Sequence, residues 1–123
     1  MGKFIIQNNM YTYKAKLDRV IDGDTIDANI NLGFDITIHK RIRLTGIDTP
    51  ESRTRDLEEK ARGLAAKDFV VKMLKNHNNQ FILHSQGVGK YGRCLGEIFL
   101  GDENLNDLLI TEGHAVEYDG GKR

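Results

Sequence analysis

Three stretches in the first part of the chain alternate apolar and polar residues, which is the period of a half-buried β-strand. They are YTYKAKLDRVI (11–21), TIDANINL (25–32) and ITIHKRIRLTGI (36–47). Asp-Gly-Asp-Thr separates the first two, and Gly-Phe-Asp precedes the third. In the second and third stretches the residues expected to face inward are Ile26, Ala28, Ile30, Leu32, Ile36, Ile38, Ile42 and Leu44. Short turns between alternating segments predict a meander of three strands.

From Asp56 onward the apolar period changes to that of a helix. Its expected apolar face consists of Leu57, Ala61, Leu64, Ala65, Phe69 and Met73, and the polar run 76–79 ends it. QFILHS (80–85) and RCLGEIFL (93–100) are predicted strands on either side of the loop GVGKYGR. NLNDLLITEG (104–113) predicts a short helix with a glycine stop, and AVEY (115–118) predicts a last short strand.

The order of these elements is strand, strand, strand, helix, strand, strand, helix, strand. It is the order of a five-stranded Greek-key barrel with a helix inserted after the third strand. The predicted fold class is therefore α+β, mainly β: an OB-fold with that inserted helix and a short helix near the C-terminus. The 123 residues predict a single domain over 1–123 with its core at about 11–118. OB barrels bind oligonucleotides or oligosaccharides, but the fold alone does not decide the function.

The overall charge and hydropathy exclude several classes of protein. The net charge is zero, which argues against capture of nucleic acid by overall charge alone. No apolar run approaches the roughly 18–20 residues of a membrane span. The N-terminal residues lack the apolar region of a signal peptide, so we expect an intracellular protein, with a phage or plasmid origin or a processed secreted form left open. The single Cys94 excludes an internal disulfide bond.

Asp22-Gly23-Asp24-Thr25 is first of all a hairpin turn, because Asp-Gly between alternating strands favours one. It is not an EF-hand loop: the fifth and sixth positions counted from Asp22 are Ile26 and Asp27, and an EF-hand needs Gly at the sixth. Asp24 and Thr25 still go beyond what a turn requires.

RLTGIDTPE (43–51) carries one base and two acids where a strand ends. Part of it is explained if Thr49 caps a helical turn, with Pro50 in the first position and Glu51 near the helix N-terminus. That interpretation does not explain why Arg43 and Asp48 are present in this segment. Because Leu44 is expected in the core, Arg43 should project from the opposite face.

The loop GVGKYGR (87–93) matches the pattern G-x-G-x-x-G, but no strand–helix–strand unit surrounds it. It is not a phosphate-binding P-loop either, because Tyr91 follows Lys90 where Ser or Thr is required. What remains is a loop with Lys90, Tyr91 and Arg93, suited to a phosphate and a stacked base, or simply solvated.

Asp24, Asp48 and Glu51 come from two segments, and Arg43 and Arg93 from two. Carboxylates that converge repel one another unless a hard cation lies between them. A cation together with two guanidinium groups suits a phosphodiester whose non-bridging oxygens gain charge, and Glu51 would then orient or deprotonate water. The histidines have no metal-ligand spacing and are expected to be structural or surface residues: His39, His77, His84 and His114.

DGDT, RLTGIDTPE, KYGR and NDLLITEGHAVEY, in this order, resemble the staphylococcal-nuclease-like (thermonuclease) family over about Lys14 to Tyr118. The resemblance implies a Ca²⁺-dependent phosphodiesterase that cleaves DNA and RNA endonucleolytically and leaves 3′-phosphates. Mg²⁺ and Mn²⁺ remain alternative metals. DNA or RNA, preferably single-stranded, is the expected partner of a monomer or weak dimer, with no membrane partner.

The resemblance also implies a role for each motif residue. Metal ligands are expected at Asp24, Asp48 and the backbone carbonyl of Thr49, with Asp22 supporting them; catalytic residues at Arg43, Glu51 and Arg93; substrate contacts at Lys90, Tyr91 and Tyr118. The spacing from Gly113 to Tyr118 is one residue shorter than the family pattern. Two alternatives stay open: an OB module that binds nucleic acid or protein without catalysis, and a purely structural Ca²⁺ site.

Overall fold

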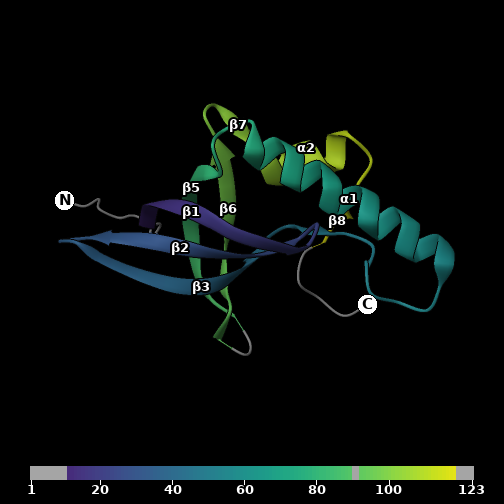
Figure 1. Ribbon diagram of the computed structural model, residues 1–123, viewed down its shortest axis with the longest axis horizontal. Helices are drawn as coiled ribbons and strands as arrows, with labels where there is room; N and C mark the ends of the chain where they lie inside the picture. Colours follow the sequence, from purple (N-terminus) through teal and green to yellow (C-terminus); the bar gives the residue numbers. More distant parts are fainter. Residues whose placement is uncertain (1–10, 90–91, 119–123) are drawn as a thin grey trace, which may run out of the picture.

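The computed structural model describes residues 11–89 and 92–118. Its first three strands are β1 (Tyr11–Asp22), β2 (Thr25–Gly33) and β3 (Ile36–Leu44), joined as the predicted antiparallel meander. β5 (Gln80–Val88) pairs with β1, and β6 (Cys94–Leu100) pairs with β5. β6 also pairs in parallel with β3, which closes the five-stranded barrel (Figure 1). The predicted OB-type barrel is confirmed.

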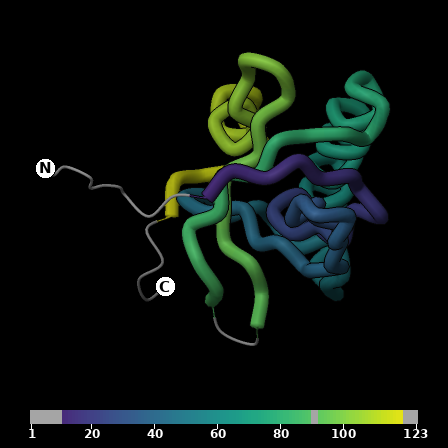
Figure 2. The backbone as a smooth tube through the Cα atoms, turned by 90° about the vertical axis from the view of Figure 1, so that its left-hand side faces the viewer, coloured from purple at the N-terminus to yellow at the C-terminus, as the bar shows by residue number. Residues whose placement is uncertain are grey.

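The remaining elements surround the barrel. α1 (Leu57–Lys75) follows the third strand as predicted, and α2 (Leu105–Thr111) lies near the C-terminus. β7 (Glu103–Asn104) extends the sheet beside β6, and β4 (Ile47–Asp48) pairs with β8 (Val116–Glu117) in a small second sheet. The two helices occupy separate positions around the barrel (Figure 2). Neither α1 nor α2 is long and apolar enough to cross a membrane.

The core lies inside the barrel and beneath the two helices. The inward residues of β2 and β3 that are fully buried are Ile26, Ala28, Ile30, Ile42 and Leu44, as the alternation predicted. α1 adds Val70 and Leu74 to this core, and α2 adds Leu105 and Leu109. Burial of these side chains is the main favourable term that holds both helices against the barrel.

The predicted third strand is in fact two strands, β3 and β4. The chain turns at Thr45-Gly46, where Gly46 has a φ of +81°, a backbone conformation that favours glycine. Two predicted inward residues near the β2–β3 turn are also exposed, because this hairpin extends beyond the closed part of the barrel: Leu32 is 38% exposed and Ile36 51%.

The predicted apolar face of α1 was wrong, although the helix itself is present. The buried residues are Gly63, Ala66, Val70 and Leu74. Leu57 and Leu64 are exposed, as are Ala61 and Ala65, whereas Phe69 and Met73 pack at the edge of the core. Apolar residues are spread around this helix, so contact with the rest of the protein, and not the sequence period, selects the buried face.

Candidate active site

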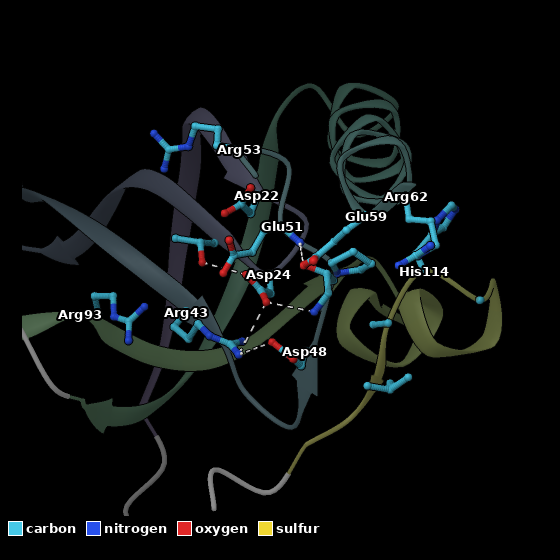
Figure 3. A pocket seen from close by; sticks show the side chains of 16 residues that line it. Asp22, Asp24, Arg43, Asp48, Glu51, Arg53, Glu59, Arg62, Arg93 and His114 are labelled. Carbon is cyan, nitrogen blue, oxygen red and sulfur yellow. Dashed lines mark hydrogen bonds and ion pairs between the residues drawn. The ribbon is translucent and has the colours of Figure 1, made fainter. Parts of the chain in front are cut away.

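A cleft of about 840 Å³ lies where β2 begins and β3 ends, between the segment after β4 and the turn after α2 (Figure 3). It collects most of the predicted site residues: Asp22, Asp24, Arg43, Asp48, Thr49, Glu51 and Arg93. Four more charged or titratable residues that the sequence analysis did not assign to the site also line it: Arg53, Glu59, Arg62 and His114.

The turn between β1 and β2 places Asp24 in the wall of this cleft. Asp22 pairs with Thr25 across the turn, so the predicted hairpin is confirmed. A Cβ at Gly23 would lie 2.8 Å from the Cβ of Ala66, so glycine is required by the close approach of α1. The buried Asp24 accepts a hydrogen bond at Oδ2 from the backbone N–H of Thr49 at 3.1 Å. This bond joins the turn to the segment after β4.

Arg43 connects the carboxylates of Asp24 and Asp48. It projects from the face of β3 opposite the buried Leu44, as the strand period predicts, and its side chain is 16% exposed. Its Nη2 lies 3.6 Å from Asp24 Oδ2 and 3.5 Å from Asp48 Oδ1, while Nη1 donates to the Leu44 carbonyl at 2.6 Å. Two carboxylates from different segments thus converge on the guanidinium group of Arg43.

The donor chemistry at this point fits a hard cation in part. Within residues 11–89 and 92–118 no group of three or more Asp, Glu, His or Cys side chains is arranged to hold a metal. Asp24 and Asp48 nevertheless share Arg43 as a positive partner, and Thr49, which follows Asp48, also lines the cleft. Two carboxylates completed by a carbonyl and waters form an oxygen ligand set that Ca²⁺ or Mg²⁺ accepts.

Asp22 is held at the edge of the same cleft. Both the backbone N–H and the hydroxyl of Ser52 donate to Asp22 Oδ1, the former at 3.3 Å. The carboxylate of Asp22 is therefore tied to the residue that follows Glu51. This is a second connection, besides that of Asp24 with Thr49, between the turn after β1 and the segment after β4.

Glu51 lies in a segment without helix or strand, so the interpretation of Thr49 as a helix cap was wrong. α1 begins six residues after Glu51, and Asp56 caps it by accepting from the N–H groups of Glu58 and Glu59. The backbone N–H of Glu51 donates to Glu59 Oε2 at 3.2 Å. The first turn of α1 therefore sets the backbone position of Glu51, whose exposed side chain lines the cleft.

Arg93 enters the cleft from the residues before β6, on the same side as Arg43 (Figure 3). The parallel pairing of β3 with β6, in which Arg43 is the partner of Leu95, brings the two arginines together. Among the described residues the buried Nε of Arg93 has no hydrogen-bond partner. The residue itself lines the cleft, so its guanidinium group adds a second positive charge beside Arg43.

Of the three predicted substrate contacts, only Tyr118 belongs to the part of the chain that the structure describes, and it does not line this cleft. Lys90 and Tyr91 lie outside the described residues. Tyr118 lines a neighbouring pocket of about 500 Å³, and the Arg43 guanidinium carbon lies 6.0 Å from the centre of its ring. Tyr118 therefore contacts the site through Arg43.

His114, expected as a structural or surface residue, lines the cleft and packs its ring 4.9 Å from that of Phe69. Glu59 and Arg62 are three residues apart on α1 and therefore share one face of the helix. That spacing is visible in the sequence. Its connection with the site depends on the position of α1 against residues 51 and 52.

Residues 41–122 match the sequence profile of the family described as "Staphylococcal nuclease homologue". The chain belongs to the staphylococcal nuclease family. The predicted resemblance is confirmed by relatives over most of the chain. The chain is similar to a thermonuclease of Staphylococcus intermedius, with 40% identity over 79% of this chain and 55% of the relative.

Two further relatives are matched over slightly more of both chains. A thermonuclease of Staphylococcus hyicus is 35% identical over 87% of this chain and 59% of the relative. A micrococcal nuclease of Shigella flexneri is 30% identical over 86% of this chain and 59% of the relative. The chain thus spans somewhat more than half the length of these staphylococcal nuclease relatives.

Proposed function

We propose that this chain is a metal-dependent nuclease that hydrolyses phosphodiester bonds of DNA and RNA, with Ca²⁺ as its cofactor. The observation that carries the proposal is the meeting of Asp24, Asp48, Arg43, Glu51 and Arg93, which come from separate segments, in one cleft. The names of the relatives, thermonuclease and micrococcal nuclease, point to the same chemistry.

In this proposal Asp24, Asp48 and the carbonyl of Thr49 hold the cation, and Mg²⁺ or Mn²⁺ are alternatives. When bound, the ion supplies positive charge to the non-bridging oxygens of the scissile phosphate. The N–H of Thr49 orients the Asp24 carboxylate through its hydrogen bond of 3.1 Å. Asp22, held by Ser52, supports this end of the cleft without being a ligand itself.

The protein side chains perform the remaining work. Glu51 accepts a proton from water while the water oxygen bonds to phosphorus. The bond from phosphorus to the 5′-oxygen then breaks, and that oxygen takes up a proton from solvent water and leaves as a hydroxyl. The products are a 3′-phosphate and a 5′-hydroxyl. Arg43 and Arg93 donate to the phosphate oxygens as their negative charge increases, and Arg93 also favours departure of the 5′-oxygen.

The direct test is cleavage of single-stranded DNA with Ca²⁺, compared with the same reaction in EDTA. We expect cleavage only with the metal, and a product end that phosphatase treatment converts from 3′-phosphate to 3′-hydroxyl. Arg93→Lys should lower kcat by roughly 10²-fold, because a lysine provides one point charge in place of a planar fork of donors.

Glu51→Gln removes the proton acceptor and should lower the rate by roughly 10²–10⁴-fold. Glu58→Gln is the matched control: Glu58 is exposed on α1 and does not line the cleft, so its rate should equal that of the wild type. Metal-independent binding of DNA without cleavage would instead establish a non-catalytic OB module. A melting temperature raised by Ca²⁺ without turnover would establish a structural metal site.

A further inference from the structure

The outer face of β1, β2 and β3 carries successive rows of polar side chains that begin in the cleft. The pairing register places Thr25 of β2 beside Arg43 of β3, and both line the cleft. The next row along the strands contains Arg19, Asp27 and Arg41 from β1, β2 and β3. The face thus continues away from the catalytic arginine with two more arginines.

This second row has a surplus of positive charge. The buried Asp27 accepts hydrogen bonds from Arg41 Nε at 2.8 Å and from Arg19 Nε at 3.0 Å. These hydrogen bonds, that of Arg41 foremost, lower the pKa of Asp27 to about 2, so its carboxylate is charged at neutral pH. One carboxylate therefore pairs with two guanidinium groups, and the side chains remain 65% exposed at Arg19 and 43% exposed at Arg41. Both arginines retain N–H groups that face solvent.

The third and fourth rows extend the same face. They consist of Lys16, Asn29 and His39, followed by Lys14, Asn31 and Thr37. Lys14 and Lys16 are exposed and form no ion pair with the described residues, whereas His39 pairs with Asp18 at 3.0 Å. Four Lys or Arg side chains thus accompany two acids, Asp18 and Asp27, on the part of the face beyond the cleft.

A groove of about 830 Å³ lies over the third and fourth rows. Besides Lys14, Lys16, Asn29 and Asn31, its walls include Gln80 of β5 and Phe99 of β6. None of the described residues that line it is acidic. Ammonium groups, amides and an aromatic ring are the groups with which proteins contact the phosphates, base edges and base faces of a single strand.

We propose that one strand of the nucleic-acid substrate continues from the catalytic cleft across this face into the groove. The inference rests on the proposed nuclease function. From Arg43 to Thr37 the path covers six residues of β3, or roughly 20 Å, which accommodates several nucleotides. It also explains how a chain with zero net charge attracts a polyanion: the cations gather on the face that leads to the cleft.

The experiment compares two charge-neutralised variants on two substrates. In K14Q/K16Q the groove loses both lysines. K67Q/K72Q is the matched control, with the same change of net charge on α1 at two residues that line neither the cleft nor the groove. The substrates are a thymidine dinucleotide, which occupies only the cleft, and a 16-nucleotide thymidine strand.

Each phosphate contact to a single strand contributes about 0.7 to the slope of log affinity against log salt concentration. K14Q/K16Q should therefore reduce the slope of log(kcat/KM) for the long strand by about 1.4. At 0.1 M salt this corresponds to a loss of roughly tenfold or more in kcat/KM relative to K67Q/K72Q. Cleavage of the dinucleotide should be unchanged. N31D, which adds a negative charge in the groove while keeping both lysines, should act in the same direction.

Equal effects of the two double variants on the long strand, or equal effects of K14Q/K16Q on both substrates, would overturn the proposed path. Failure of the wild type to cleave either substrate would overturn the nuclease function instead. The path is then decided by fluorescence anisotropy with the labelled 16-nucleotide strand. Weaker binding by K14Q/K16Q than by K67Q/K72Q supports it, and equal binding refutes it.

Discussion

Gly63 of α1 determines where Glu51 lies, and its replacement by alanine tests how the cleft is built. Gly63 is buried against the backbone of residues 51 and 52. An added Cβ would lie 2.7 Å from the backbone nitrogen of Ser52, and nearer still to the carbonyl group of Glu51. Since ordinary contacts between heavy atoms are about 3.5–4.0 Å long, relieving the shortest contact, that with the Glu51 carbonyl oxygen, requires the segment or the helix to shift by roughly 1 Å or more.

The same substitution should have a small net effect on stability and a large effect on catalysis. Alanine in place of glycine stabilises a helix interior by about 1 kcal/mol, while overpacking of a buried site costs about 1–3 kcal/mol. We therefore expect Gly63→Ala to lower the free energy of unfolding by no more than about 2 kcal/mol. A displacement of about 1 Å at a catalytic group costs about 10²-fold in rate, so kcat should fall by that order.

The assay combines urea denaturation with steady-state cleavage of single-stranded DNA under conditions where every variant is folded. Ala61→Gly is the control, because Ala61 is exposed on α1 and its replacement should cost about 1 kcal/mol of stability without any change in kcat. If Gly63→Ala cleaves DNA with the wild-type kcat, α1 does not position Glu51 and the argument is refuted.

Two further predictions concern the stability of the fold. The pKa of Asp27 is lowered from 3.8 to about 2, so its ion pairs stabilise the protein above about pH 4, and this contribution is lost as the pH falls through 2. The difference in unfolding free energy between wild type and Asp27→Asn is on the order of 1 kcal/mol, given the exposed arginines, and should shrink over that pH range in denaturation experiments. A difference that does not depend on pH would contradict this prediction. Asn106→Ala should lower the free energy of unfolding by about 3 kcal/mol in urea denaturation. The buried amide donates to the carbonyls of Thr45 (2.8 Å) and Gly96 (3.3 Å) and accepts from the N–H of Ile98 (3.2 Å). A loss as small as that of the exposed control Thr111→Ala would show that these groups find other partners.

The strands of the barrel were predictable because their signal is local. Alternation in β2 places Ile26, Ala28 and Ile30 on one face, and no distant contact is needed to establish that period. The turn at Asp22–Thr25 and the stop of α2 at Gly113 are local in the same sense, since each depends on the conformation of a few consecutive residues. The buried face of α1 was not predictable, because its apolar side chains are spread around the helix.

The sequence by itself determined which chemical groups this protein has and where its strands run. The residue types of Asp24, Asp48, Glu51, Arg43 and Arg93 already form a set whose chemistry suits a phosphodiester. Only the tertiary structure brought them into one cleft, through the parallel pairing of β3 with β6 and the contact of Gly63 with the backbone of Glu51. Only the strand register gathered the lysines and arginines of β1 and β3 on one face. The physical reason is that hydrophobic period and turn chemistry act over a few residues, whereas these contacts join segments far apart in the chain.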